Sequence, residues 1–352
     1  MGPVPPTDPA ETGGPVRPHP AAGLDGDIDR YLVEVDRELQ PYLDQAVERT
    51  PEVDCLKEGV SYQVLGGGKR VRAALCATTC EMFCGSYRPA LHFAAAIEHL
   101  QNFSLIHDDI ADGDGERRGR PSAWQRFGVA HAINIGDAFI PLSSLAILEG
   151  AYSAQTKVAL FQVLSELGLL VTEGQGLDIN LRRNDAPTPE DYVQCARKKT
   201  GAFFAMAAVG GGIIGGADAR DLQRLRAFAL QAGVAFQIKD DALDVVGGKG
   251  RPLGSDVLEG KRTLMVAYAS ERSAAAERGR MFAILNRARQ ETTPDEVAWV
   301  HELFRRTRAR ERAEQTANSL IDEAVQYLAE LPETAAKYRF VRLSKYLMQR
   351  SR

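Results

Sequence analysis

Two acidic clusters in this 352-residue chain share one spacing. The first lies in HDDIADGDG, from residue 107, and the second lies in QIKDDALD, from residue 237. Positions i and i+4 of a helix lie one turn apart on one face, so Asp108 pairs with Asp112 and Asp240 pairs with Asp244. Each pair of carboxylates can therefore bind a cation.

The donor chemistry indicates which cation and which substrate. Carboxylate oxygens favour Mg²⁺, which keeps several waters and takes one or two protein carboxylates together with substrate phosphate oxygens. A single cluster of this kind would also fit a solvated helix end. Two copies, both embedded in apolar segments, favour a magnesium site that binds a diphosphate.

Basic residues near these clusters are candidates for binding the diphosphate. In GGGKRVR, from residue 66, they follow three glycines, where backbone N–H groups and an ammonium can approach an anion closely. Guanidinium groups, which suit bidentate phosphate contacts, follow the first acidic cluster. A lone Lys-Arg pair usually belongs to a solvated surface, so the interpretation depends on the whole set: Lys69, Arg70, Arg72, Arg117, Arg118, Lys199 with Thr200, Arg251 and Lys261.

The elements that must position these residues are predicted to be helices. Apolar residues recur at helical spacing from Ile28 onward, and alternating strand patterns are scarce. The expected fold class is all-α, a single large helical bundle over residues 27–352. Long helices are predicted over 70–85, 89–112, 122–149, 154–182, 189–215, 219–246, 256–272 and 294–329.

Residues 1–26 have a different composition. They are crowded with Pro, Gly and Ala and hold almost no large apolar side chains, so they cannot bury enough surface to offset the entropy lost on ordering. We expect a disordered tail, either a solvated extension or a segment that docks an unknown protein.

Composition argues against several functional classes. The formal net charge is −4, whereas nucleic-acid binders are usually basic. No apolar run approaches the roughly 20 residues of a membrane span, and the N-terminus lacks a secretory signal, so we expect a cytoplasmic protein. Five cysteines are too few and odd in number for a disulfide framework, and we expect reduced thiols.

Together these motifs resemble the trans-isoprenyl diphosphate synthase family, over the segment from Tyr62 to Lys261. The family motif GGKRxRP reads GGKRVRA here, and the lysine motif reads KTG. The two aspartate-rich regions read DDIADGDGERRGRP and FQIKDDALDVVG, the latter followed by GSDVLEGKRT. The resemblance implies a fold of the isoprenoid synthase type with a central active-site cavity, and a homodimer. Within the family the chain is most similar to geranylgeranyl diphosphate synthases.

The resemblance also implies the metal ligands. Asp108 and Asp112 would bind two Mg²⁺ ions on the allylic diphosphate, and Asp240 would bind a third, supported by Asp244. Asp178, in EGQGLD, is a further candidate ligand. The implied cofactor is therefore magnesium, with three ions in each active site.

Substrate contacts follow from the same resemblance. Arg117, Lys199 and Lys261 would bind the allylic diphosphate. Isopentenyl diphosphate would be bound by Lys69, Arg72, Gln101 and Arg118, with Arg70 and Arg251 as further candidates. The groups that face the carbocation or support the ligands would be Gln175, Asp178, Thr200 and Gln237.

Three positions depart from the family pattern. Ala73 stands for the usual proline, Gly201 for a common alanine, and Arg251 for the usual lysine. None of these changes removes a ligand. Arg251 keeps the charge but changes its geometry.

The expected reaction is prenyl transfer by metal-assisted ionisation. The allylic C–O bond breaks, the double bond of isopentenyl diphosphate attacks the cation, and the released diphosphate accepts the proton. No histidine base is required, so His107 is interpreted as a packed neighbour of the site. Water must be excluded, because it would capture the cation as an alcohol.

The residues that precede Asp108 predict the product length. Phe103 lies five positions earlier, roughly 7 to 8 Å along the helix, and its neighbour Ser104 is small. A bulky residue at the first position alone resembles geranylgeranyl diphosphate synthases, which predicts a C20 product. The alternative products of the same reaction are C15 and C25. The alternative interpretation of Phe103 is an ordinary core aromatic that does not set the product length.

Two other functions remain open for the same fold. A class I terpene cyclase shares the first metal motif but uses a different second motif. A catalytically silent partner subunit usually lacks acidic ligands. The intact second DDxxD and GGKRVR favour the synthase over both.

Overall fold

The computed structural model describes residues 26–246 and 253–348. The predicted tail lies outside the described residues apart from Gly26, which begins the first helix. Short 3-10 turns occupy Arg88–Ala90 and Arg289–Glu291, and a two-residue hairpin is formed by β1 (Glu116–Arg117) and β2 (Arg120–Pro121). The helices are α1 (Gly26–Arg49), α2 (Leu56–Leu65), α3 (Val71–Cys84), α4 (Leu91–Asp112), α5 (Ala123–Phe127), α6 (Val129–Glu149), α7 (Ala154–Leu181), α8 (Pro189–Ala196), α9 (Ala202–Gly215), α10 (Ala219–Asp244), α11 (Ser255–Leu258), α12 (Leu264–Arg272), α13 (Ala275–Leu285), α14 (Pro294–Thr307), α15 (Ala309–Gln326) and α16 (Ala335–Met348).

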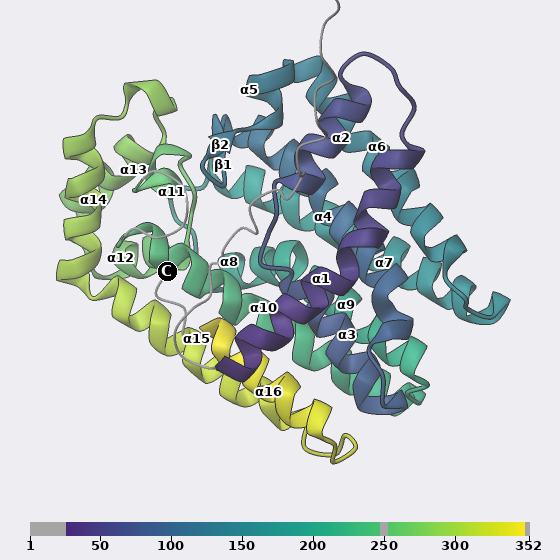
Figure 1. The fold of residues 1–352 in the computed structure, drawn as a ribbon. Coiled ribbons are helices and arrows are strands. Elements are labelled where there is room, and N and C mark those ends of the chain that lie inside the picture. The colour runs from purple at the N-terminus through teal and green to yellow at the C-terminus, as the bar shows by residue number, and fades with distance from the viewer. Residues whose placement is uncertain (1–25, 247–252, 349–352) are drawn as a thin grey trace, which may run out of the picture.

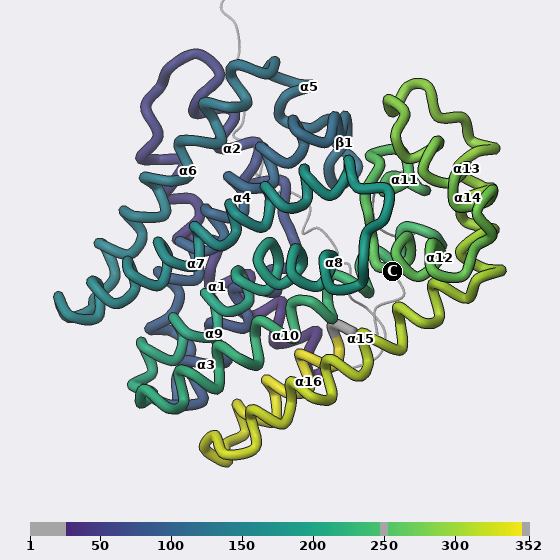
Figure 2. The backbone as a smooth tube through the Cα atoms, turned by 180° about the vertical axis from the view of Figure 1, so that it is seen from behind, coloured from purple at the N-terminus to yellow at the C-terminus, as the bar shows by residue number. Residues whose placement is uncertain are grey.

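Helix α4 runs through the main bundle. It packs on α3, α6 and α9, and α9 also packs on α3, α7 and α10. Figures 1 and 2 show α11 to α14 as a group beside this bundle, joined to it by α15, which leads into α16. The predicted fold class, an all-α bundle, is confirmed.

Glycines let α9 approach its neighbours closely. A Cβ at Gly210 would lie 1.9 Å from Phe93 of α4, and a Cβ at Gly211 would lie 2.3 Å from the carbonyl oxygen of Cys76 in α3. Cys76 is fully buried at this contact. This close packing fixes the position of α4, which carries the first acidic cluster.

Several predicted helices are divided in the structure. The prediction 122–149 is interrupted at Gly128 (φ 81°), which separates α5 from α6. The prediction 294–329 is divided at Arg308 (φ 54°) into α14 and α15. A residue with positive φ leaves the right-handed helical region, so the chain turns there.

Two further divisions occur at functional candidates. Within the prediction 189–215, a π-helical turn at Arg197–Gly201 separates α8 from α9 and contains Lys199 and Thr200. Within the prediction 256–272, residues 259–263 are not helical, and Lys261 lies there. Helices α1, α2, α13 and α16 lie outside the predicted ranges, although apolar residues at helical spacing from Ile28 onward indicated α1 and a similar pattern occurs in α16.

Two helices among the described residues are long and apolar enough to cross a membrane by length and composition alone, a test that core helices of globular proteins also pass. Helices α6 and α7 both meet that test, with 44% and 22% of their apolar windows buried. One side of α6 packs on α4, and α7 packs on α9, so both helices belong to the bundle. Apolar residues remain exposed on their other sides.

Candidate active site

The first acidic cluster lies in the last turns of α4. Gly113 (φ 68°) ends this helix in the left-handed conformation, which costs glycine little. The side chains of Asp108 and Asp112 are only 16% and 2% exposed. Buried carboxylates require positive partners, and the neighbouring helices supply them.

Lys199 brings positive charge to this cluster from the π-helical turn. Its Nζ lies 2.9 Å from Asp178 Oδ2 in α7 and 3.7 Å from Asp108 Oδ1. Burial opposes the charge of Lys199, but the two aspartates outweigh it and raise the pKa of the lysine. Lys199 therefore stays protonated between two candidate metal ligands.

Lys261 connects the two acidic motifs. Its Nζ lies 3.3 Å from Asp112 Oδ2, 2.5 Å from Glu259 Oε2 and 3.8 Å from Asp256 Oδ1. The backbone N–H of Asp256 donates to Asp244 Oδ2 at 3.1 Å. A continuous chain of contacts thus runs from the end of α4 to the end of α10.

The two outer aspartates of the second acidic cluster, Asp244 and Asp240, have different surroundings. Asp244 is buried and accepts hydrogen bonds from Ser255 Oγ (2.7 Å) and from the Asp256 N–H, both in α11. This arrangement agrees with a supporting role for Asp244. Asp240 is half-buried, and its negative charge acts on the buried guanidinium of Arg72.

Asp241, the middle residue of that motif, holds a network together. Tyr192 Oη and Gln237 Nε2 each donate to it at 2.7 Å. Thr200 Oγ1 donates to Gln237 Oε1, also at 2.7 Å. Sequence reasoning missed Tyr192, because its partner lies far away in the sequence.

Arg182 is a second residue that sequence reasoning missed. Its Nη2 lies 2.6 Å from Asp112 Oδ1 and 3.3 Å from Asp178 Oδ2. Burial would raise the pKa of Asp112, but Lys261 and Arg182 hold it well below its usual range. The sequence did offer one signal for Arg182: it lies four residues after Asp178, and residues i and i+4 share a helix face.

A third missed group lies beside Asp112. Carboxylate oxygens of Asp112, Asp114 and Glu259 all lie within 4.8 Å of one another, close enough to share a metal ion. Burial raises the pKa of Glu259 to about 7. Arg289 Nη1 donates to Asp114 Oδ1 (2.7 Å) and to the Asp112 carbonyl (3.3 Å).

Arg117, a predicted diphosphate ligand, pairs with a carboxylate in the structure. Its Nε donates to Asp109 Oδ1 at 2.8 Å, and its Nη2 lies 3.7 Å from Asp114 Oδ2. These contacts hold the β1–β2 hairpin against α4. The guanidinium therefore lies beside the first acidic cluster.

The glycine-rich loop lies against Arg118. Arg118 donates to the carbonyl oxygen of Gly67, and a Cβ at Gly68 would lie 3.0 Å from Arg118 Nη2. Lys69 follows directly in the chain. The structure thus brings two predicted isopentenyl diphosphate ligands, Lys69 and Arg118, to one loop.

Arg70 directly precedes α3 and has the left-handed conformation (φ 47°). Its buried guanidinium donates to Asp36 Oδ1 at 2.9 Å and to Glu98 Oε2 at 3.0 Å. These contacts join α1, α3 and α4. Its predicted role as a substrate ligand stays a prediction, and its contacts are those of a residue that positions the loop.

Arg72 and Gln101 are both directed into the protein interior. The Arg72 guanidinium lies over the rings of Phe203 and Phe204, at 5.2 and 5.7 Å from their centres. The Gln101 Oε1 atom and the Gln175 Oε1 atom have no hydrogen-bond partner among the described residues. Their predicted roles remain predictions.

The predicted chain-length residues, Phe103 and Ser104, lie on α4 just before the first acidic cluster. The Phe103 ring is partly buried and lies 4.5 Å from the ring of His107, between centroids. His107 Nε2 lies 3.4 Å from the Ile133 carbonyl oxygen, and a Cβ at Gly136 would lie 2.5 Å from the same nitrogen. Ser104 is half-buried beside Phe103.

Comparison with known proteins identifies the family. A family model described as polyprenyl synthetase matches residues 53–304. The chain belongs to the polyprenyl synthetase family.

Individual relatives of this polyprenyl synthetase cover nearly all of it. A short chain isoprenyl diphosphate synthase of Methanothermobacter thermautotrophicus is 34% identical over 330 residues, 91% of this chain and 99% of that protein. A geranylgeranyl diphosphate synthase of Saccharolobus solfataricus is 30% identical over 306 residues, 84% of this chain and 90% of that protein. The crystal structure of geranylgeranyl pyrophosphate synthetase from Pyrococcus horikoshii has a TM-score of 0.83 at 29% identity, and covers 92% of this chain and 99% of that chain.

The predicted family and the predicted enzyme class are therefore confirmed. The packing around Gly201 explains why this chain tolerates glycine where the family pattern commonly has alanine. A Cβ at Gly201 would lie 2.7 Å from the Leu230 carbonyl oxygen, and a Cβ at Gly233 would lie 2.5 Å from the Gly201 Cα. Glycine at 201 thus lets the Lys199 turn pack directly on α10. Ala73 is fully buried, and Arg251 lies outside the described residues.

Proposed function

We propose that this polyprenyl synthetase condenses isopentenyl diphosphate with an allylic diphosphate, and that its product is C20 geranylgeranyl diphosphate. The observation that carries the proposal is the connection of the two DDxxD motifs through Lys261, which lies 3.3 Å from Asp112 and 3.8 Å from Asp256. The relatives named geranylgeranyl diphosphate synthase support the product.

The residues present fit the magnesium that the family implies, because every candidate ligand is a carboxylate oxygen. We assign the ligands of three ions to Asp108, Asp112, Asp178, Asp240 and Asp244. When bound, Mg²⁺ would stabilise the negative charge that develops on the departing diphosphate.

The lysines supply fixed positive charge to the same diphosphate. Asp178 and Asp108 keep Lys199 protonated, and Glu259 and Asp112 raise the pKa of Lys261 well above its ordinary value. A preorganised cation in a buried site needs no reorganisation as the C–O bond breaks. Arg117 adds a guanidinium beside the first cluster.

We assign isopentenyl diphosphate to Lys69, Arg118, Arg72 and Gln101. The glycine-rich loop over Arg118 supplies backbone flexibility and cationic groups together. Arg70 positions this loop through its ion pairs with the half-buried Asp36 and the buried Glu98. We also propose that Arg251 contacts isopentenyl diphosphate.

The carbocation would be stabilised by the oxygens next to it. The Thr200 hydroxyl, fixed by its hydrogen bond to Gln237, presents a lone pair in the Lys199 turn. The double bond of isopentenyl diphosphate attacks the cation, and the proton passes to the released diphosphate. Phe103, with Ser104 beside it, would end the cavity that holds the growing chain.

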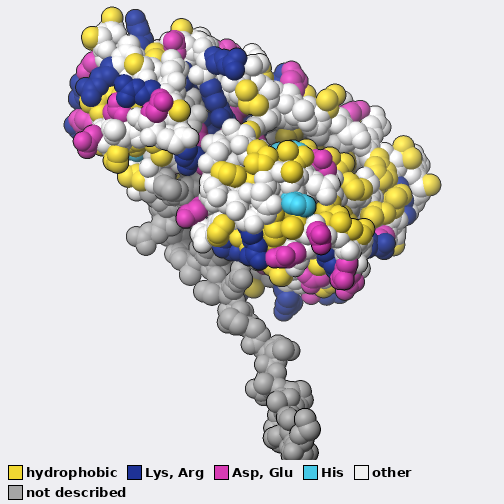
Figure 3. Space-filling model, turned by 90° about the horizontal axis from the view of Figure 1, so that it is seen from above, with side chains coloured by type: hydrophobic (Ala, Val, Ile, Leu, Met, Phe, Trp, Pro, Cys, Tyr) yellow, Lys and Arg dark blue, Asp and Glu magenta, His cyan; other side chains and the backbone are white. Residues whose placement is uncertain are grey.

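We further propose a homodimer formed through α6 and α7. Exposed apolar residues gather on the side where these helices lie (Figures 1 and 3), and they include Val129, Ile133, Ile140, Leu148, Val158 and Leu169. Monomers rarely expose such contiguous apolar area to water. We keep the cytoplasm as the proposed location and an unknown protein as the proposed partner of residues 1–26.

The test is a product analysis with purified protein. The protein is incubated with Mg²⁺, labelled isopentenyl diphosphate and, separately, C5, C10 and C15 allylic diphosphates, and the dephosphorylated alcohols are separated by length. A dominant C20 alcohol is expected. A C15 or C25 product would overturn the length assignment, and a cyclic hydrocarbon or no elongation would overturn the reaction.

A further inference from the structure

Tyr192 is buried next to the second acidic cluster and has no role in the reaction described above. It lies in α8, and 6% of its surface is exposed. Its hydroxyl donates to Asp241 Oδ2 at 2.7 Å. Burial and the neighbouring Asp241 carboxylate raise the pKa of Tyr192 well above its ordinary value, so the hydroxyl keeps its proton and acts as a donor.

The hydrogen bonds that begin at Tyr192 have a defined direction. An ionised carboxylate only accepts, so the end of the Gln237 side chain that lies 2.7 Å from Asp241 Oδ1 must be its NH₂ group. The Gln237 carbonyl oxygen then faces Thr200 Oγ1, also at 2.7 Å. A carbonyl oxygen only accepts as well, so the Thr200 hydroxyl must donate to it. The lone pairs of the Thr200 hydroxyl are therefore directed away from Gln237.

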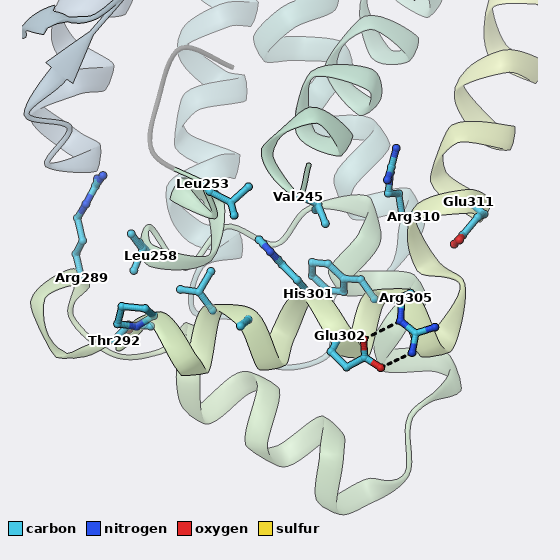
Figure 4. Close-up of a pocket in the computed structure, with 14 residues that line it drawn as sticks. Val245, Leu253, Leu258, Arg289, Thr292, His301, Glu302, Arg305, Arg310 and Glu311 are labelled. Carbon is cyan, nitrogen blue, oxygen red and sulfur yellow. Dashed lines mark hydrogen bonds and ion pairs between the residues drawn. The ribbon is translucent and has the colours of Figure 1, made fainter. Parts of the chain in front are cut away.

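Water has little access to this network, which consists of Tyr192, Asp241, Gln237 and Thr200. Asp241 and Thr200 are 6% and 5% exposed. The cavity that Figure 4 shows between Val245 and α14 is lined by none of the four residues. In a site of low dielectric constant each hydrogen bond is stronger than in water, and bonds in a series polarise one another. The orientation of the Gln237 amide is therefore set by Asp241.

The backbone that carries the network is held on several sides. Helix α8 begins with a capping box at Thr188 and runs directly into the π-helical turn that contains Thr200. A Cβ at Gly174 of α7 would lie 2.3 Å from the Lys199 nitrogen, so α7 packs closely on this turn. π-helical turns inside helices occur frequently at functional sites. The bond from Tyr192 to α10 fixes α8 just before the turn that must present Thr200.

We propose that Tyr192 and Asp241 are positioning residues, which orient the Gln237 amide so that Thr200 presents lone pairs, and not its proton, to positive charge in the active site. That charge is the allylic cation of the proposed function, on which the inference rests. A reversed amide would donate to Thr200, and the hydroxyl proton would then turn toward the cation. Tyr192 and Asp241 thus favour a cationic centre through Thr200.

Asp241→Asn tests the direction of the bonds with almost no change in shape. The buried Tyr192 hydroxyl needs an acceptor and takes the oxygen of the new amide, so the new NH₂ group faces Gln237. Gln237 must then turn its own oxygen to that group and its NH₂ group to Thr200. The Thr200 hydroxyl becomes an acceptor, and its proton turns toward the active site.

Two unreactive substrate analogues measure the orientation of the Thr200 hydroxyl. One is a C15 diphosphate in which a tertiary ammonium nitrogen replaces the carbon that carries the positive charge. The other is the C15 thiolodiphosphate, which has no charge at that carbon and whose bridging sulfur resists ionisation. Each is titrated into the full-length protein with Mg²⁺ by isothermal titration calorimetry. Both bind the metal ions through a diphosphate, so an effect on the metal cancels in the ratio of the two dissociation constants.

The unmodified protein should prefer the ammonium analogue, because the site is complementary to positive charge. Asp241→Asn should reduce this preference about tenfold, and Thr200→Val, which removes the hydroxyl, should reduce it as much. In the Thr200→Val protein, Asp241→Asn should have no further effect, because both changes act on one hydroxyl. Additive losses in the double variant, or an unchanged preference in Asp241→Asn, would refute the proposal.

Tyr192→Phe removes one donor and should reduce the preference about threefold, which also tests the proposal if Asp241→Asn does not fold. Tyr268→Phe is the matched control, because Tyr268 is also 6% exposed and its hydroxyl forms a hydrogen bond with Thr316 at 2.9 Å. Equal losses in these two variants would contradict the role of Tyr192. Selective binding of the ammonium analogue by a protein that elongates no primer would refute the proposed function and still support the orientation of Thr200.

Discussion

Arg182, the residue that follows α7, joins Asp112 of α4 to Asp178 of α7, with its Nη2 at 2.6 and 3.3 Å from their oxygens. The Asp112 side chain is 2% exposed, so this guanidinium neutralises charge that water cannot reach. Both carboxylates are proposed magnesium ligands. A metal ion at Asp112 must therefore share or displace Arg182.

Arg182→Gln should lower the magnesium concentration needed for binding. Loss of a competing cation strengthens the field at Asp112, and we expect half-saturation to fall about tenfold, equivalent to about 1.4 kcal/mol. The measurement is thermal unfolding across a MgCl₂ titration with inorganic diphosphate present. The neighbouring exposed Arg183→Gln is the control, and equal behaviour of both variants would contradict the competition.

Asp112→Asn should remove most elongation activity. The side chain would lose a charged oxygen toward Mg²⁺ and leave Lys261 and Arg182 less compensated, and we expect kcat to fall about 10²- to 10³-fold. Steady-state elongation assays with far-ultraviolet circular dichroism as a folding check measure this. Asp322→Asn, on the exposed face of α15, should retain full activity.

Phe103→Ala should lengthen the product. The partly buried ring that contacts His107 would no longer end the cavity, so chains of C25 and longer should accumulate. Ser104→Phe should have the opposite effect and favour C15. Chromatography of the dephosphorylated products is the measurement, with Phe83→Ala in α3 as the control. A C20 product from Phe103→Ala would show that this ring is an ordinary core residue.

Gly201→Ala should destabilise the protein although alanine is common in the family at this position. The new Cβ would lie 2.7 Å from the Leu230 carbonyl, and backbone cannot move aside cheaply. We expect a loss of about 1–3 kcal/mol in urea unfolding. Gly279→Ala, where no atom lies within 4 Å, should instead gain about 0.5–1 kcal/mol. Equal effects would refute the close approach.

His99 should make the protein sensitive to acid. Burial lowers the pKa of His99 to about 3, whereas the unfolded residue titrates near 6.5. The unfolded state therefore binds the extra proton between these values, so the histidine's contribution to stability falls as the pH drops below about 6.5. The free energy of unfolding falls in both proteins when the pH is lowered from 7 to 5.5. We expect this fall to be about 1.4 kcal/mol smaller in His99→Leu than in the unmodified protein. The measurement is urea unfolding at pH 7 and at pH 5.5, and the exposed His131→Gln variant is the control. An equal fall in the free energy of unfolding in all three proteins would refute the role of His99.

The sequence by itself determined the chemistry and the fold class. Asp108 with Asp112, and Asp240 with Asp244, are separated by one helical turn, and this short-range geometry can be read without a structure. Helical periodicity likewise predicted α3, α4, α7 and α10, because apolar spacing reflects one buried face.

The tertiary structure decided which charges meet. Tyr192 with Asp241, Lys261 with Asp112, Arg182 with Asp112, and Arg289 with Asp114 are contacts between segments far apart in the chain. Arg70 shows the same limit: its motif predicts a substrate ligand, and only the tertiary structure reveals that its buried guanidinium pairs with Asp36 and Glu98. Local sequence fixes the period of a helix but not its neighbours, because packing depends on the burial of every helix at once.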